Sequence, residues 1–175
     1  MPYTIAHVYN SAKGNKDYSA YGSSSAFGLQ TGKGFMLNLQ QRMDKVTDPA
    51  MLEYGYAYVW LDGDGTQHYF KAIENATDQW EDEDGLNLTL TKETIENTPY
   101  LYLSDKDDNY FIFNEGDGLL CFIPSNLPDS TNTVVKRKNY IALGYDGTVL
   151  QKVSNPEGQT IASFVYNSSN LLTQV

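Results

Sequence analysis

The sequence predicts an all-β fold, an antiparallel meander of stacked β-hairpins with little or no helix. Strand-like runs bounded by Gly, Asp, Asn or Pro recur every ~8–12 residues, which is typical of a curved sheet, a sandwich or an open-barrel-like shell segment. Helical periodicity is almost absent. Fourteen Tyr, seven Phe and two Trp in a polar chain indicate hairpins whose aromatic side chains pair across strands.

A strand–turn–strand unit appears twice, 43 residues apart. The copies cover residues 59–70 and 102–113, and in both an apolar strand runs into Asp-x-Asp, turns, and leaves through aromatic residues. A looser third copy covers residues 151–161. Recurrence of this kind means that the protein is built by stacking similar hairpins.

The N-terminal third begins with one strand and one long loop. Residues 3–9 read as a strand, and residues 10–34 form a Gly/Ser/Lys/Asn-rich loop with little pattern. Residues 35–43 alternate apolar and polar side chains over most of their length, the mark of a half-buried strand. The segment 44–53 is ambiguous, although its Thr-Asp-Pro sequence can cap one short helical turn.

The rest of the chain carries ten further strand predictions. They cover residues 54–61, 66–72, 86–91, 100–104, 109–114, 119–123, 139–143, 148–153, 160–166 and 171–175. Residues 124–138 form a polar connection that contains two prolines. We therefore predict a single β domain over residues 1–175.

The net charge of −10 is concentrated in one stretch. Fifteen of the 22 acidic residues lie between Asp62 and Asp117, where three lysines offset them. This stretch would repel a phosphate backbone, so we expect no nucleic-acid binding. No run of 18 apolar residues occurs, so we expect no membrane insertion. Residues 1–5 show no signal peptide, and a start almost inside a strand suggests a piece of a longer protein.

The residues that usually carry catalysis form no catalytic pattern. Cys121 lies in an apolar run, which favours a small buried residue over a reactive thiol. His7 and His68 are the only histidines, and each falls within a strand pattern, where a cross-strand neighbour is the more common role. The sequence has no nucleophile elbow, no zinc spacing and no phosphate loop. We predict that the protein is not an enzyme.

The acidic turns suggest calcium as one alternative, because hard cations prefer clustered carboxylates and carbonyls. Asp105, Asp107 and Asn109 match positions 1, 3 and 5 of an EF-hand loop, and Asp62 and Asp64 open the other copy. Neither copy has the glycine of the sharp turn or the closing bidentate glutamate. The other interpretation, which we favour, is a β-turn in which Asp and Gly supply the geometry and solubility.

A carbohydrate-binding adhesin module is another alternative, because flat aromatic rings suit the faces of sugars. The platform would consist of Trp60, Trp80, Tyr54, Tyr56 and Tyr58. The three tyrosines alternate, so we expect them on one face of their strand. That face can equally be the core side of a hairpin, and periodicity does not say which face is buried.

Five segments follow one another in a characteristic order. Residues 5–11 form a strand that ends near Tyr-Asn, 32–38 read Gly-x-Gly-aromatic-x-Leu-Asn, 62–70 read Asp-x-Asp-Gly-Thr-x-x-x-Phe, 83–86 contain Asp-Gly-Leu, and 149–175 end in Leu-x-x-Val. In this order the segments resemble the region that precedes and begins the tyrosine/aspartate (YD) repeats of bacterial Rhs-type proteins. They span nearly the whole chain.

The resemblance implies a structural role in a large protein that is secreted or held at the bacterial cell surface or wall. Repeats of such proteins coil into a hollow β-shell, which in some members encloses a toxic C-terminal segment. Residues 1–123 would then be the hairpin region before the repeats, and residues 139–175 one degenerate repeat. No segment resembles the self-cleaving core-associated region, so we expect no cleavage and no catalytic residues.

The resemblance also implies that the partner is the remainder of the parent chain, with further repeats. A truncated array leaves edge strands open, here residues 3–9 and 171–175, through which isolated copies can form a dimer. A cell-surface glycan is the partner in the adhesin alternative. We expect no cofactor, apart from calcium if the protein is the calcium-stabilised β module.

Overall fold

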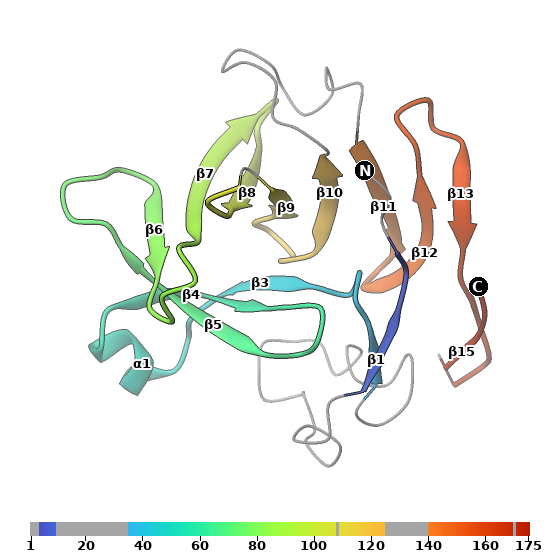
Figure 1. The fold of residues 1–175 in the computed structure, drawn as a ribbon, viewed down its shortest axis with the longest axis horizontal. Coiled ribbons are helices and arrows are strands. Elements are labelled where there is room, and N and C mark those ends of the chain that lie inside the picture. The colour runs from blue at the N-terminus through green and yellow to red at the C-terminus, as the bar shows by residue number, and fades with distance from the viewer. Residues whose placement is uncertain (1–3, 10–34, 108, 125–139, 170) are drawn as a thin grey trace.

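The computed structural model describes residues 4–9, 35–107, 109–124, 140–169 and 171–175, in which strands dominate (Figure 1). The all-β prediction is confirmed. The elements in chain order are β1 (His7–Tyr9), β2 (Phe35–Leu37), β3 (Arg42–Lys45), α1 (Pro49–Glu53), β4 (Tyr56–Leu61), β5 (Gln67–Ala72), β6 (Gln79–Asp82), β7 (Thr89–Ile95), β8 (Thr98–Ser104), β9 (Tyr110–Asn114), β10 (Leu120–Pro124), β11 (Tyr140–Asp146), β12 (Val149–Ser154), β13 (Thr160–Ser163), β14 (Val165–Tyr166) and β15 (Leu172–Gln174).

One eleven-stranded antiparallel sheet organises the described part of the chain. Its strand order runs from β3 to β13 without a crossover, so each inner strand pairs with the strands before and after it in the sequence. β1 and β2 form a separate two-stranded sheet, and so do β14 and β15. Residues 7–9 and 172–174 therefore each pair on one side in a small sheet of their own, whereas β3 and β13 end the large sheet. The dimer through residues 3–9 and 171–175 stays a prediction.

The sheet curls until β3 meets the turn between β9 and β10 (Figure 1). The Met43 N–H donates to the Gly118 carbonyl at 2.9 Å, and Arg42 forms an isolated bridge with Leu119. Gly118 has a φ of +73°, and a Cβ there would lie 2.7 Å from both the Asp44 Oδ1 and the Met43 carbonyl oxygen. Only glycine allows this close approach. The contact is local, and the sheet does not close into a barrel.

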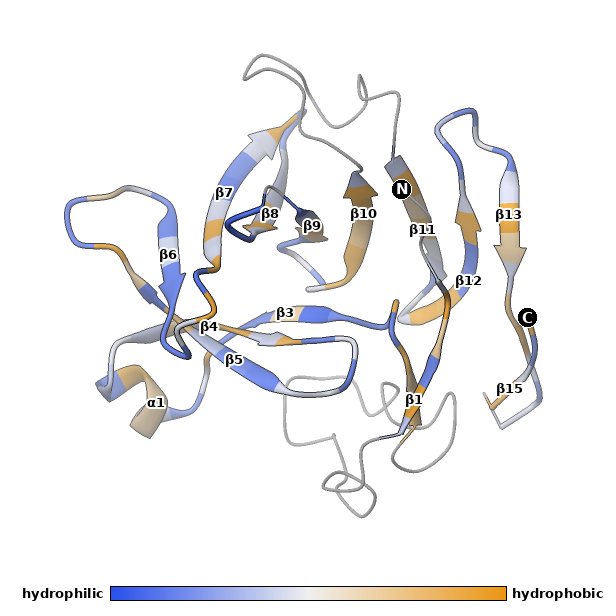
Figure 2. Ribbon diagram, viewed as in Figure 1, coloured by the Kyte–Doolittle hydropathy of each residue, from blue (hydrophilic) through white to orange (hydrophobic). Residues whose placement is uncertain are grey.

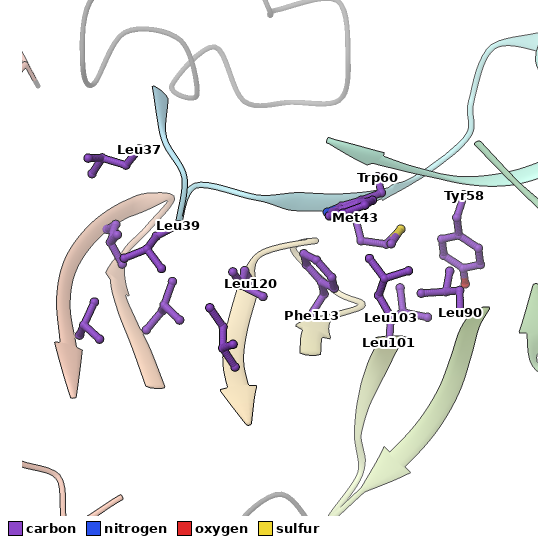
Figure 3. Close-up of a cluster of buried hydrophobic side chains, with 14 of the residues drawn as sticks. Leu37, Leu39, Met43, Tyr58, Trp60, Leu90, Leu101, Leu103, Phe113 and Leu120 are labelled. Carbon is purple, nitrogen blue, oxygen red and sulfur yellow. The ribbon is translucent and has the colours of Figure 1, made fainter. Parts of the chain in front are cut away.

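The apolar core lies inside the curl, between the segment from β2 to β4 on one side and β7 to β12 on the other (Figure 3). Alternation along each strand sends every second side chain inward. The hairpin turns are mainly hydrophilic, whereas β10 is largely hydrophobic (Figure 2). The largest fully buried side chains are Phe70, Phe113, Leu37, Leu39, Met43, Leu90, Leu101, Leu103, Ile112, Leu120 and Leu150.

The predicted strand over residues 35–43 is interrupted between β2 and β3. Asn38 holds the break, because its Oδ1 accepts from the Ala6 N–H at 2.9 Å and its Nδ2 donates to the Thr4 carbonyl at 2.8 Å. These bonds attach the turn to the N-terminal segment. Leu37 and Leu39 are both buried. A continuous strand would also place these two side chains on one face, so the break does not change which of them is buried.

Two other local predictions had different outcomes. The short helical turn is confirmed as α1, where the Asp48 side chain accepts from the Ala50 N–H. β6 was not predicted, and residues 86–91 lie partly before β7. The predicted loop over residues 10–34 and nearly all of the connection over residues 124–138 lie outside the described residues.

Candidate functional site

The first acidic turn is held by its own side chains. Asp62 Oδ1 accepts from the backbone N–H groups of Asp64 at 3.0 Å and Thr66 at 2.8 Å. Asp64 Oδ1 accepts from the Thr66 N–H at 2.9 Å and from its hydroxyl at 2.6 Å. The Asp62 N–H donates to the Thr66 carbonyl and closes the hairpin at 3.0 Å. These carboxylates therefore satisfy turn N–H groups, as aspartates commonly do.

The second acidic turn repeats this bonding. Asp105 Oδ1 accepts from the N–H groups of Asp107 at 2.8 Å and Asn109 at 3.0 Å, and its Oδ2 accepts from Asn109 Nδ2 at 2.8 Å. Burial acts to raise the pKa of Asp105, but the bonds from Asn109 and Asp107 outweigh it and lower that pKa. Asp107 pairs with the exposed Lys106. The turn is again closed from within its own residues.

Two asparagine turns follow the same scheme. Asn155 Oδ1 accepts from the Gln159 N–H at 2.8 Å, so the looser third copy turns as expected. Asn167 Oδ1 accepts from the N–H groups of Ser169 at 2.9 Å and Leu171 at 3.0 Å, a fourth copy that the sequence analysis missed. The signal in the sequence is an Asp or Asn four positions before the residue that leads into the next strand. We call these four segments, headed by Asp62, Asp105, Asn155 and Asn167, the Asx turns.

Among the described residues, no group of three or more His, Cys, Asp or Glu side chains is placed to hold a metal ion. The two acidic Asx turns lie in different hairpins, between β4 and β5 and between β8 and β9. The five residues proposed for calcium therefore lie in two separate turns, Asp62 and Asp64 in one and Asp105, Asp107 and Asn109 in the other.

His68 lies between two carboxylates. Its Nε2 is 3.2 Å from Asp62 Oδ2, and its Nδ1 is 2.8 Å from Asp84 Oδ2. A carboxylate only accepts hydrogen bonds, so both contacts are satisfied when both ring nitrogens carry a proton. The bond to Asp62 raises the pKa of His68, burial opposes this, and Asp84 adds to the rise. His68 therefore ties the first Asx turn to the segment between β6 and β7.

The position of His68 follows from the alternation of β5. It pairs across the strands with Trp60, and their ring centroids are 5.1 Å apart. The side chain of His68 is only 10% exposed. The expectation of a cross-strand neighbour is confirmed. Both ring nitrogens contact protein carboxylates.

Glu115 forms a second ionic cluster, which the sequence analysis missed. Its side chain is 7% exposed, and its Oε1 accepts from Lys45 Nζ at 2.9 Å and from the Tyr58 hydroxyl at 2.9 Å. Its Oε2 lies 2.8 Å from Lys92 Nζ. Burial alone would raise the pKa of Glu115, but these three donors outweigh it and lower that pKa to about 2. We call this set the Glu115 cluster.

The Glu115 cluster joins distant parts of the sheet. Lys45 ends β3, Tyr58 belongs to β4, Lys92 belongs to β7, and Glu115 directly follows β9. Burial raises the pKa of the Tyr58 hydroxyl further above its usual value, and Glu115 adds to this rise. The Glu115 carboxylate binds the polar groups of the other three side chains. The cluster therefore links β3, β4, β7 and the end of β9, and this holds the sheet in its curled form.

The proposed aromatic platform is divided by the fold. Trp60 and Tyr58 are buried, with Tyr58 packed edge-on against the half-buried Trp80 at 4.8 Å between centroids. Tyr54 caps the end of α1 and is 70% exposed. Tyr56 pairs across the strands with Lys71 and lies apart from Tyr58, Trp60 and Trp80. The structure therefore assembles Tyr58, Trp60 and Trp80 as core and leaves Tyr54 apart.

The expectation that the three tyrosines share one face is wrong. Tyr54 lies outside β4, and the register between β4 and β5 shifts between Tyr56 and Tyr58. As a result Tyr56 faces the other side, where its ring lies 5.1 Å from that of Tyr69 and 4.6 Å from Lys71 Nζ. A bulge of this kind reverses the alternation that the sequence pattern assumes.

Comparisons with protein-family models, with curated proteins and with solved structures give no match. In the parts of the chain that the structure describes, no helix is long and apolar enough to span a membrane.

Proposed function

We propose that this chain is a non-catalytic structural segment of the β-shell of a Rhs-like bacterial protein, secreted or displayed at the cell surface. The observation that carries the proposal is the strand order of the large sheet, which runs from β3 to β13 in sequence. A shell made of repeats grows in this way, because each hairpin is laid beside the one before it. The partner of the segment is the remainder of the parent chain.

The polar clusters support a structural role. His68 pairs with Asp62 and Asp84, and Glu115 pairs with Lys45 and Lys92, so both clusters link separate hairpins of the sheet. The Asx turns use their side chains to close hairpins. The side chains of the Asx turns thus stabilise individual hairpins, and the groups around His68 and Glu115 connect one hairpin to another.

Coupled unfolding with neighbouring repeats tests the proposal. The 175-residue chain is compared with the longer parent chain that this proposal predicts, by calorimetry and by urea denaturation. Stacked repeats stabilise one another, so we expect the transition of this segment to move to higher temperature in the longer form. A Leu150→Ala variant, which opens the core at a fully buried position, is the control and should lower that same transition.

Two results would contradict the structural role. One is an unchanged, separate transition of this segment in the longer form. The other is specific ligand binding, since the adhesin and calcium alternatives predict it. A glycan array with tryptophan fluorescence tests sugars, and melting with and without millimolar calcium tests the metal, because a ligand of the native state raises the midpoint.

A further inference from the structure

β13 pairs along only one of its sides within the described residues. It lies against β12, with Val153 opposite Ala162, and the Phe164 N–H just beyond it donates to the Gln151 carbonyl at 2.9 Å. Backbone groups alternate in direction along an antiparallel strand. Since Ala162 and Phe164 face β12, the N–H and carbonyl of Ser163 point to the opposite side.

β15 lies on that same opposite side. β14 continues the path of β13 after Phe164, and β15 runs antiparallel to it, with Val165 opposite Gln174. The Thr173 hydroxyl donates to the Val165 carbonyl at 3.0 Å, which places this carbonyl on the β15 side. β15 therefore ends pointing along the free side of β13, and Figure 1 shows β13 and β15 on one margin of the molecule.

Extending the observed register fixes which residues would meet. With Val165 opposite Gln174, the next pair is Phe164 with Val175, and the position after Val175 lies opposite Ser163. Phe164 is buried in the core, and cross-strand partners share a face. Val175 is apolar and 61% exposed, so a longer β15 would turn it toward the core side of the sheet.

The free side of β13 lacks the features that usually block strand addition. Native edges are commonly protected by charged residues or by proline. The four residues of β13 are Thr, Ile, Ala and Ser, and Ile161 is 58% exposed. The other end of the large sheet differs, because β3 is met there by the turn that contains Gly118.

We propose that the free edge of β13 is a docking site for one extended segment, which runs antiparallel to β13 as the continuation of β15. The segment adds a twelfth strand to the sheet, and its first residue beyond Val175 lies opposite Ser163. Its source is the parent chain after Val175, a point that rests on the proposed function. Backbone hydrogen bonds supply the attachment, as in other cases of strand addition.

Cysteine cross-linking in the protein as its gene encodes it tests this register. Cys121 is first replaced by Ala, and cysteines are placed at Ser163 and at the first position after Val175. Directly opposite residues in antiparallel strands have Cα atoms roughly 4.5–5.5 Å apart, a separation that a disulfide bridges. We expect an intramolecular disulfide on mild oxidation, seen by mass spectrometry of the monomer.

The matched control moves one cysteine by a single residue. Ala162→Cys replaces Ser163→Cys, and its side chain points to the other face of the strand. We expect its cross-linking rate to be lower by on the order of tenfold. Amide hydrogen exchange gives a second readout that needs no cysteine, since the Ser163 N–H should be protected in the encoded protein and unprotected in the 175-residue chain.

The outcomes separate this inference from the proposed function. A disulfide that forms only between two molecules shows that a second copy occupies the edge and overturns the inference. Equal cross-linking of both cysteine pairs, or an unprotected Ser163 N–H, overturns it as well, even if YD repeats follow Val175. A specific disulfide in a protein whose downstream sequence holds no repeats supports the docking site and contradicts the Rhs-like assignment. An encoded chain that ends at Val175 contradicts both.

Discussion

Replacing Glu115 by Gln removes the charge at the centre of the Glu115 cluster while keeping the shape of the side chain. The amide oxygen can still accept from the Tyr58 hydroxyl, but the attraction to Lys45 and Lys92 is lost. Lowering a carboxyl pKa from 4.5 to about 2 corresponds to about 3 kcal/mol of stabilisation of the charged form. Lys45 is 62% exposed and can return to water, so we expect a loss of about 2–3 kcal/mol at pH 7.

The pH dependence gives the sign of this effect. The folded-state pKa of Glu115 is lowered, so its contribution is fully present above the unfolded value of 4.5 and disappears as the pH falls toward about 2. Urea denaturation followed by tryptophan fluorescence, repeated from pH 7 to pH 2, measures the difference between the original chain and Glu115→Gln. We expect that difference to shrink steadily below pH 4, because the original carboxyl then becomes neutral too.

Glu93→Gln is the matched control for the charge change. Glu93 is exposed on β7, next to Lys92 in sequence, and its replacement alters the net charge by the same amount. We expect it to change the free energy of unfolding by less than about 0.5 kcal/mol. If the two variants lose equal stability, or if the Glu115→Gln difference stays constant down to pH 2, the cluster does not fasten the sheet as we argue.

Three further predictions concern the other described features. The two carboxylates should hold the pKa of His68 above 6.5 in an NMR titration, and the stability that His68 contributes should be lost as the pH rises through that folded value; a folded pKa at or below 6.5 contradicts the ion pair. Asp105→Ala should cost about 1 kcal/mol in urea denaturation because three turn donors lose their acceptor, whereas Asp107→Ala should be nearly neutral. Gly118→Ala should cost at least about 2 kcal/mol through strain and contact with β3, while Gly147→Ala, with φ +57° and open space, should cost about 1 kcal/mol; equal losses would contradict the close approach.

The sequence predicts the meander well because its signals are local. Alternation of side chains marks strands such as β5, and Asp or Asn marks turns such as that between β4 and β5. The capping residue Asp48 likewise acts on Ala50, two positions away. Features that depend on a few neighbouring residues are therefore visible in the sequence.

β6 was missed because its own sequence carries no strand signal. It reads Gln-Trp-Glu-Asp, so Trp80 is its single apolar residue, and Trp80 packs against the core. The segment is extended because β5 and β7 offer backbone partners on both sides. Tertiary context decides such a strand, whereas propensity favours a polar turn.

The ionic clusters were missed because their members are far apart in sequence. Glu115 lies 57 positions from Tyr58, and no short pattern announces that pair. His68 offered a usable hint, since a histidine that alternates with the buried Phe70 must bring a polar partner to its face of the strand. The identity of that partner depends on how the loops are folded.

The strand order of the large sheet also determines the order in which its strands can pair during synthesis. Each strand from β4 onward finds its partner in the segment made just before it, so pairing can keep pace with synthesis and requires few long-range encounters. The contacts that fasten the curl are exceptions, because β3 and β4 must wait until Glu115 and Gly118 in the turn after β9 have emerged. The growing chain therefore lengthens its sheet one hairpin at a time and fixes the curvature only when the turn with Glu115 and Gly118 has been made.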